Sequence, residues 1–151
     1  MKTLKRIGLV IMVVLVGLQF FPTRTNQSTE VPTTDIILSY RAPENIENIL
    51  HTSCYNCHSN NTNYPWYSHV QPVGWLLESH INKGKEELNL SEFGSYSVRR
   101  QKSKLNSMVN QIEKGEMPLY SYTLIHRDAR LSQDQKKTLV NYLNSILDSL
   151  Q

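Results

Sequence analysis

This 151-residue chain has only two cysteines, and it lacks the partners that most roles of a cysteine pair require. It has no further cysteine and no His-x3-5-His pair, so a structural zinc site would be short of ligands. Strand patterns are nearly absent, so the βαβ setting of a thioredoxin-like pair is missing. A disulfide between Cys54 and Cys57 would close a loop too short to stabilise the chain much.

The sequence also lacks the basic surface that binds nucleic acid. Its formal net charge of +3 includes four basic residues near the N-terminus, at positions 2, 5, 6 and 24, whereas all 13 acidic residues lie after Thr25. The other 12 basic residues and the 13 acidic residues give the rest of the chain a net charge of about −1. We therefore expect no nucleic-acid partner.

One long apolar run is present, from Ile7 to Phe21, and basic residues precede it. This pattern predicts an export signal. As a helix the run would measure about 22 Å, short of the roughly 30 Å apolar core of a bilayer, which favours a cleaved signal peptide. No small-x-small cleavage site follows Phe21, which favours an uncleaved anchor in the inner membrane. Residues 1–22 are thus predicted to be a signal peptide or N-terminal membrane anchor, with the remainder on the extracytoplasmic, periplasmic side.

Composition divides the rest of the chain into two parts. Residues 23–39 begin with the polar, Thr-rich stretch "TRTNQSTEVPTT" and are predicted to be a flexible linker. Residues 40–151 are long enough for one small domain with a modest core. No cysteine lies near residue 20, which excludes a lipid-modified cysteine there.

Periodicity predicts an all-α domain of about four helices with long loops. Gly84 and Gly115 are expected to end the second and third helices, and "SQDQ" from Ser132 is a capping box that begins the fourth. The predicted helices run from Pro43 to about Cys57, from Pro72 to Gly84, from about Ser97 to Lys114, and from Ser132 onward.

The cysteines belong to the stretch "CYNCH", in which His58 follows the second thiol directly. This spacing is typical of covalent c-type haem attachment. Cys54 and Cys57 would add to the two vinyl groups, and His58 would supply the proximal iron ligand. Haem c is therefore the cofactor that the motif predicts.

The sixth iron ligand has several candidates. Met117 lies in "GEMPLY", between two predicted helices and outside any apolar stripe, so we favour it as the axial ligand. Met108 lies on the stripe of the third helix and is expected in the core. His80, on the inward side of the second helix, is the alternative.

Other residues have less specific expectations. His51 and His69 are expected on the surface, whereas His126, Arg127 or Arg130 would contact haem propionates or belong to a solvated loop. Aromatic residues near the motif and the methionine would line the haem pocket, although about half are expected to be ordinary core residues. They are Tyr64, Trp66, Tyr67, Trp75, Tyr120 and Tyr122.

The order of these motifs resembles a small family of exported bacterial haem-binding domains with a c-type motif, and more broadly the class I cytochromes c. The resemblance covers about residues 40–148 and depends on "YPWYS", "LNLSEF" and "GEMPLYSYTLIH" as well as CxxCH. It implies a cytochrome c-like fold with haem attached at Cys54 and Cys57 and bound by His58. Where the family pattern reads "LNFSEW", Leu90 and Phe93 are mild apolar replacements.

Two functional classes remain open at this stage. Ligation by His58 and Met117 would leave no position for a substrate and would make the domain a tethered electron carrier for redox partners in the cell envelope. An open sixth position would suit a haem-based gas sensor or a peroxide-active protein, with His80 as a distal acid or base. No other catalytic constellation is present, so electron transfer is favoured over an enzyme.

Overall fold

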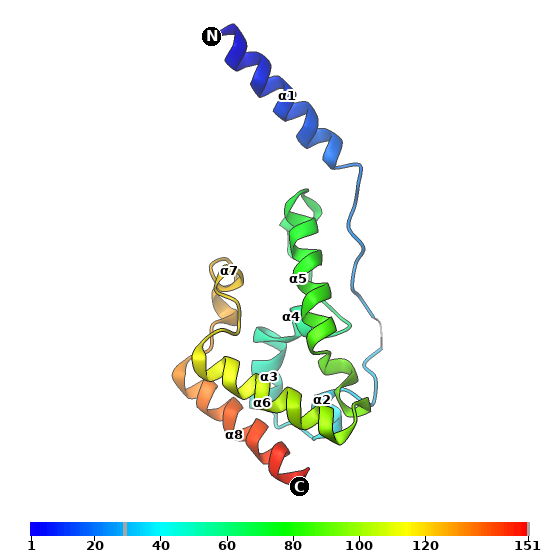
Figure 1. Ribbon diagram of the computed structural model, residues 1–151, viewed down its shortest axis with the longest axis vertical. Helices are drawn as coiled ribbons and strands as arrows, with labels where there is room; N and C mark the ends of the chain where they lie inside the picture. Colours follow the sequence, from blue (N-terminus) through cyan, green and yellow to red (C-terminus); the bar gives the residue numbers. More distant parts are fainter. Residues whose placement is uncertain (29, 151) are drawn as a thin grey trace.

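The computed structural model describes residues 1–28 and 30–150, and every regular element among them is a helix (Figure 1). The all-α prediction is thereby confirmed. The only strand-like pairing in the described residues is an isolated bridge between Gln27 and Asn61. The α-helices are α1 (Lys2–Leu18), α2 (Ile36–Ser39), α3 (Glu44–Ser53), α4 (Tyr55–His58), α5 (Val73–Glu87), α6 (Val98–Lys114), α7 (Tyr120–Thr123) and α8 (Gln133–Ser149). The 3-10 helices are η1 (Trp66–His69), η2 (Leu90–Ser95) and η3 (Arg127–Ala129).

The apolar helix α1 extends away from the rest of the chain in Figure 1, and none of its residues is buried. Among the described residues, no helix has both the length and the apolar character needed to cross a bilayer. A membrane anchor, one of the two alternatives predicted for residues 1–22, is therefore not shown by α1.

The segment 23–39, predicted to be a flexible linker, is in part packed against the domain. The backbone N–H of Asn26 donates to the Tyr64 hydroxyl at 2.7 Å, and its side-chain amide donates to the Ser59 carbonyl at 2.8 Å. Ile36, in α2, is fully buried in the core. The packed domain therefore begins before residue 40, because a buried isoleucine and an amide with several partners hold this segment in place.

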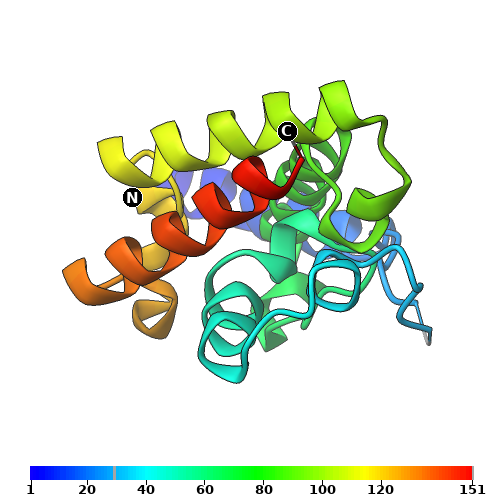
Figure 2. The same cartoon turned by 90° about the horizontal axis from the view of Figure 1, so that it is seen from below.

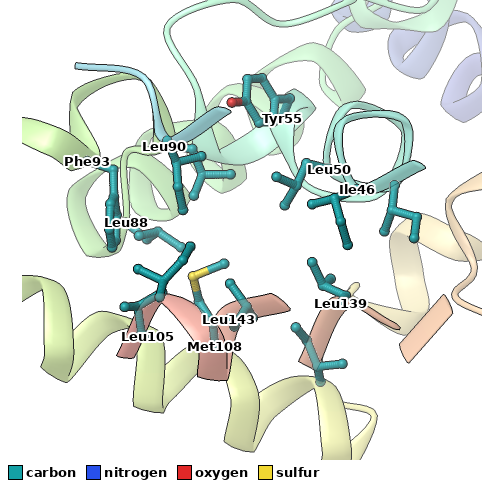
Figure 3. Close-up of a cluster of buried hydrophobic side chains, with 14 residues drawn as sticks. Ile46, Leu50, Tyr55, Leu88, Leu90, Phe93, Leu105, Met108, Leu139 and Leu143 are labelled. Atoms are coloured by element: carbon teal, nitrogen blue, oxygen red, sulfur yellow. The ribbon is translucent and has the colours of Figure 1, made fainter. Parts of the chain in front are cut away.

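The core lies where α3 and η2 meet the pair α6 and α8, which run side by side in Figures 1 and 2. Its side chains point inward from all of these elements (Figure 3). The apolar stripes of the predicted third and fourth helices contribute Leu105, Met108, Ile112, Leu139, Leu143 and Ile146. Hydrophobic burial on these stripes holds the helices together.

Helix ends follow local sequence signals at α6 and α8. Gly115 ends α6 in the left-handed conformation, with φ of 70°, which favours glycine. Ser132 and Gln135 form the predicted capping box at the start of α8, with both of its hydrogen bonds present. These two predictions are confirmed.

The first predicted helix, Pro43 to about Cys57, is divided in two. Its backbone leaves helical geometry at Cys54, with φ of −124° and ψ of −43°, so α3 ends there and α4 begins at the next residue. The break lets α3 pack on α8 while α4 packs on α5. One straight helix could not reach both neighbours.

Candidate functional site

The short helix α4 presents the CxxCH motif as a single turn. The backbone N–H groups of Cys57 and His58 both donate to the Cys54 carbonyl, at 3.2 and 3.0 Å. This turn gathers the two thiols and the imidazole on one wall of a cavity. Both cysteines are free thiols in the structure.

The imidazole of His58 is held by backbone carbonyls of the last turn of α5 and the residue after it. Its Nδ1 lies 2.9 Å from the Gly84 oxygen and 3.0 Å from the Leu88 oxygen. Both partners are acceptors, so Nδ1 must carry the hydrogen, and the lone pair is on Nε2. A histidine that binds a metal commonly has this arrangement, because the bond at one nitrogen fixes the ring and the tautomer for the other.

Gly84 does not end the second helix as predicted, because α5 continues to Glu87. Its role is a close contact with the motif. A Cβ atom on this residue would lie 2.6 Å from the Cys57 carbonyl oxygen, well inside van der Waals contact. Glycine therefore lets α5 approach α4 closely enough for the Gly84 carbonyl to reach His58.

Replacing Gly84 with alanine should separate α4 from α5 and weaken the hold on His58. We expect the free energy of unfolding to fall by about 1–3 kcal/mol, as for other overpacked sites, when denaturant unfolding of the haem-loaded chain is followed by circular dichroism. Gly17→Ala is the matched control, because a Cβ at Gly17 in α1 would meet nothing within 4 Å. Equal stability of the two variants would show that the close contact is unimportant.

The cavity has a volume of about 380 Å³, within the range of small-molecule sites. One wall comes from the motif and α5, and the other from α6, α7 and the loop between them; Figure 1 shows α5 and α7 as separate projections above α6. Residues on the first wall include Cys54, Cys57, His58, His80, Gly84 and Leu88. Those on the second include Lys104, Met108, Gln111, Ile112, Met117, Leu119 and Tyr122.

Three of the candidate sixth ligands line this cavity. Met117 is half-buried in the loop after Gly115 and lines the cavity together with His58. His80 lies one helical turn before Gly84 on α5, on the same wall as the carbonyls that hold His58. Met108 is only 8% exposed and belongs to the hydrophobic core, as expected from its stripe.

The other histidines lie outside the cavity lining. His51 and His69 are exposed, as predicted, and His51 lies 3.6 Å from Glu47. His126 stacks on Tyr122 with ring centres 4.3 Å apart and hydrogen-bonds through Nε2 to the hydroxyl of Tyr67. His51 and His69 therefore lie on the surface, and His126 contacts Tyr122, which lines the cavity.

The cavity lining includes two lysines that were not predicted from the sequence. They are Lys83 of α5 and Lys104 of α6, and Lys104 pairs with Glu87 at 3.4 Å. Arg127 and Arg130, for which contact with propionates and a place in a solvated loop were both open, are exposed and absent from the lining, and Arg130 donates to the Thr123 carbonyl. No local sequence pattern distinguishes the two lysines, since two separate helices bring them to one place.

Only one of the six aromatic residues expected in the pocket lines it, namely Tyr122. Asn56 donates to its hydroxyl at 2.8 Å, which fixes the ring beside the motif. Trp66 and Tyr120 are exposed instead. We expected about half of the six to line the pocket and the others to lie in the core, but only Tyr122 lines it, and aliphatic side chains form much of the lining.

Burial keeps both thiols in their neutral form. Desolvation, with a smaller contribution from Cys57, raises the pKa of Cys54 to about 12. Burial also raises the pKa of the Cys57 thiol. Neutral thiols and a largely apolar lining suit a flat, apolar macrocycle, and the Nε2 lone pair of His58 suits its metal. The residues present therefore fit haem.

Fold and site together define a small helical domain whose cavity carries two thiols, an oriented imidazole and a thioether. A model of the protein family described as "haem-binding domain" matches residues 13–145. The chain belongs to this family, and haem is its ligand class. No curated protein and no solved structure matches the chain.

Proposed function

We propose that this chain is an exported mono-haem c-type cytochrome domain that transfers electrons to redox partners in the cell envelope. The observation that carries the proposal is the shared cavity, which Cys54, Cys57, His58 and Met117 all line. In a site of this kind haem supplies an iron that gains or loses one electron. Residues of the chain would attach the haem and bind its iron.

Cys54 and Cys57 would hold the group covalently. Each S–H would add across one vinyl double bond, so that a sulfur–carbon bond forms, the hydrogen goes to the neighbouring carbon and nothing leaves. The turn that brings both thiols to one wall supports this role. Two thioethers would keep the cofactor in place through repeated redox cycles.

His58 and Met117 would be the two protein ligands of the iron. The carbonyls of Gly84 and Leu88 hold the ring of His58 and fix the tautomer that leaves Nε2 for the iron. The Met117 thioether would complete a His/Met pair, which raises the reduction potential. With both positions taken, the domain would pass electrons and bind no substrate at the iron.

A second candidate function rests on His80, which also lines the cavity. If the sixth position is open, this imidazole could serve as a distal acid or base for a gas sensor or a peroxide-active protein. Its place on the wall that holds His58 favours it less than Met117 as an iron ligand. We therefore keep electron transfer as the proposed function.

The visible absorption spectrum of the haem-loaded chain tests the proposal. The chain is expressed with a haem-attachment system, and the extracytoplasmic and membrane fractions are measured oxidised and then reduced. A low-spin spectrum with a near-red methionine-to-iron band is expected. A high-spin spectrum that shifts with carbon monoxide would indicate an open site, and covalent haem confined to the cytoplasmic fraction would contradict export.

A further inference from the structure

The exposed apolar residues of the domain gather at one end of it. Among the described residues from 35 to 150, the exposed large hydrophobic side chains number eleven, and nine of them lie in two short segments. Leu119 also lines the cavity, and we call the other eight the apolar end: Trp66, Val70, Val73, Trp75 and Leu76 around η1 and the start of α5, and Tyr120, Leu124 and Ile125 around α7. Leu38 and Val98 are the other two.

The two segments of the apolar end are joined through aromatic residues. Tyr67 of η1 hydrogen-bonds to His126, which follows α7, and the two ring centres are 5.9 Å apart. His126 in turn stacks on Tyr122. In Figure 1 the start of α5 and α7 both project from the body of the domain on the side that carries α1. The contact between Tyr67 and His126 therefore joins the two segments at one end of the domain.

The two segments of the apolar end contain no charged side chain. Residues 66–76 and 117–126 contain no Asp, Glu, Lys or Arg, whereas charged residues make up 19% of the chain. Both tryptophans of the chain lie here, and Trp66 is 80% exposed. Exposed aromatic and aliphatic residues without charges are unusual on a surface that faces only water, and Trp and Tyr are enriched where protein meets the headgroup layer of a membrane.

Helix α1 is attached to the same end. Gln19, at its C-terminus, exchanges two hydrogen bonds with the backbone of Gln71, at 3.1 and 3.0 Å. The indole N–H of Trp75 donates to the Phe21 carbonyl at 3.0 Å. None of the residues of α1 is buried against the domain. An apolar helix without protein packing thus leaves the domain directly beside its apolar surface.

We infer that the apolar end rests on a lipid bilayer, with Trp66, Leu76 and Leu124 among the side chains that enter its interfacial layer. A bilayer is favoured over a protein partner because it would bury both the apolar end and the adjoining α1, which no element of the described residues covers. The inference rests on the proposed export to the cell envelope and is independent of the iron ligands. Its consequence is a fixed orientation, with α5 and α7 pointing toward the membrane and the α6–α8 pair away from it.

Photo-crosslinking in vesicles tests this orientation. The full, haem-loaded chain is mixed with vesicles of phosphatidylethanolamine and phosphatidylglycerol, and Leu76 or Leu124 is replaced by the photoreactive residue benzoylphenylalanine. Leu38 and Val98 provide matched controls, since each is 52% exposed against 50% for Leu124. We expect the yield of lipid adducts, measured by mass spectrometry, to be several times higher at Leu76 and Leu124 than at either control.

Two outcomes would overturn the inference. Lipid adducts equally frequent at all four positions, or absent from Leu76 and Leu124, would mean that the apolar end does not meet lipid. Crosslinks from these positions to a second copy of the chain would make the surface a dimer interface. The haem spectrum of the same samples is a separate readout: a low-spin spectrum without lipid adducts defeats only this inference, and lipid adducts without covalent haem defeat only the proposed function.

Discussion

Changing both Cys54 and Cys57 to serine should abolish covalent haem on this chain. The physical reason is that a serine hydroxyl does not replace the sulfur of a thioether, although it preserves the size and position of the side chain. Mass spectrometry of the denatured protein, after expression with a haem-attachment system, should show the haem adduct on the wild-type chain and essentially none on the double variant. Each single variant should keep one bond and a reduced yield.

Ser53→Ala is the control for this experiment. Ser53 precedes the motif and lines the same cavity, but it has no thiol. Its alanine variant should carry haem in the wild-type yield, which would show that changes in this wall do not in themselves prevent loading. A haem adduct that survives denaturation of the double variant would contradict attachment through CxxCH and leave non-covalent binding as the role of the cavity.

Met117→Ala should convert a low-spin haem into a high-spin haem that binds carbon monoxide. Alanine is too short to reach the iron, so the sixth position would become free for water or an added ligand. We expect complete loss of the near-red methionine-to-iron band of the oxidised protein and a lower reduction potential, since methionine ligation raises it. Visible spectroscopy with and without carbon monoxide measures the first effect, and redox titration measures the second.

Met108→Leu is the matched control, because Met108 is the other methionine that lines the cavity. This nearly volume-conserving change in the core should cost less than about 1.5 kcal/mol and leave the haem low-spin. If the band is instead lost in the Met108 variant, that methionine is the ligand. An unchanged spectrum in both variants would exclude methionine, and His80→Ala would then test the remaining candidate in the cavity.

The two replacements in "LNLSEF" lie in apolar surroundings. Leu90 and Phe93, which differ from the pattern of the family resemblance, are both fully buried in η2. The Phe93 ring packs against Tyr40 and Tyr96, with ring centres 6.1 and 5.7 Å apart. Both positions require an apolar side chain that fills the core, and each replacement supplies one. They are therefore compatible with the same fold.

Features that depend only on neighbouring residues could be predicted without the structure. Apolar stripes predicted the buried faces of α6 and α8, and the glycine at 115 and the serine at 132 predicted where these helices end and begin. Their signals lie within about one helical turn, so the chain needs no distant contact to express them. The spacing of Cys54, Cys57 and His58 is equally local, and it pointed to haem before any fold was known.

Tertiary structure is needed to explain which distant residues meet. It broke the first helix at Cys54, carried α5 past Gly84, and placed the carbonyls of Gly84 and Leu88 on His58. It also brought Lys104 to the cavity and moved most of the expected aromatic residues away from it. These contacts join positions tens of residues apart. Their physical cause is the packing of α4, α5 and α6 around a common space, which no short stretch of sequence contains.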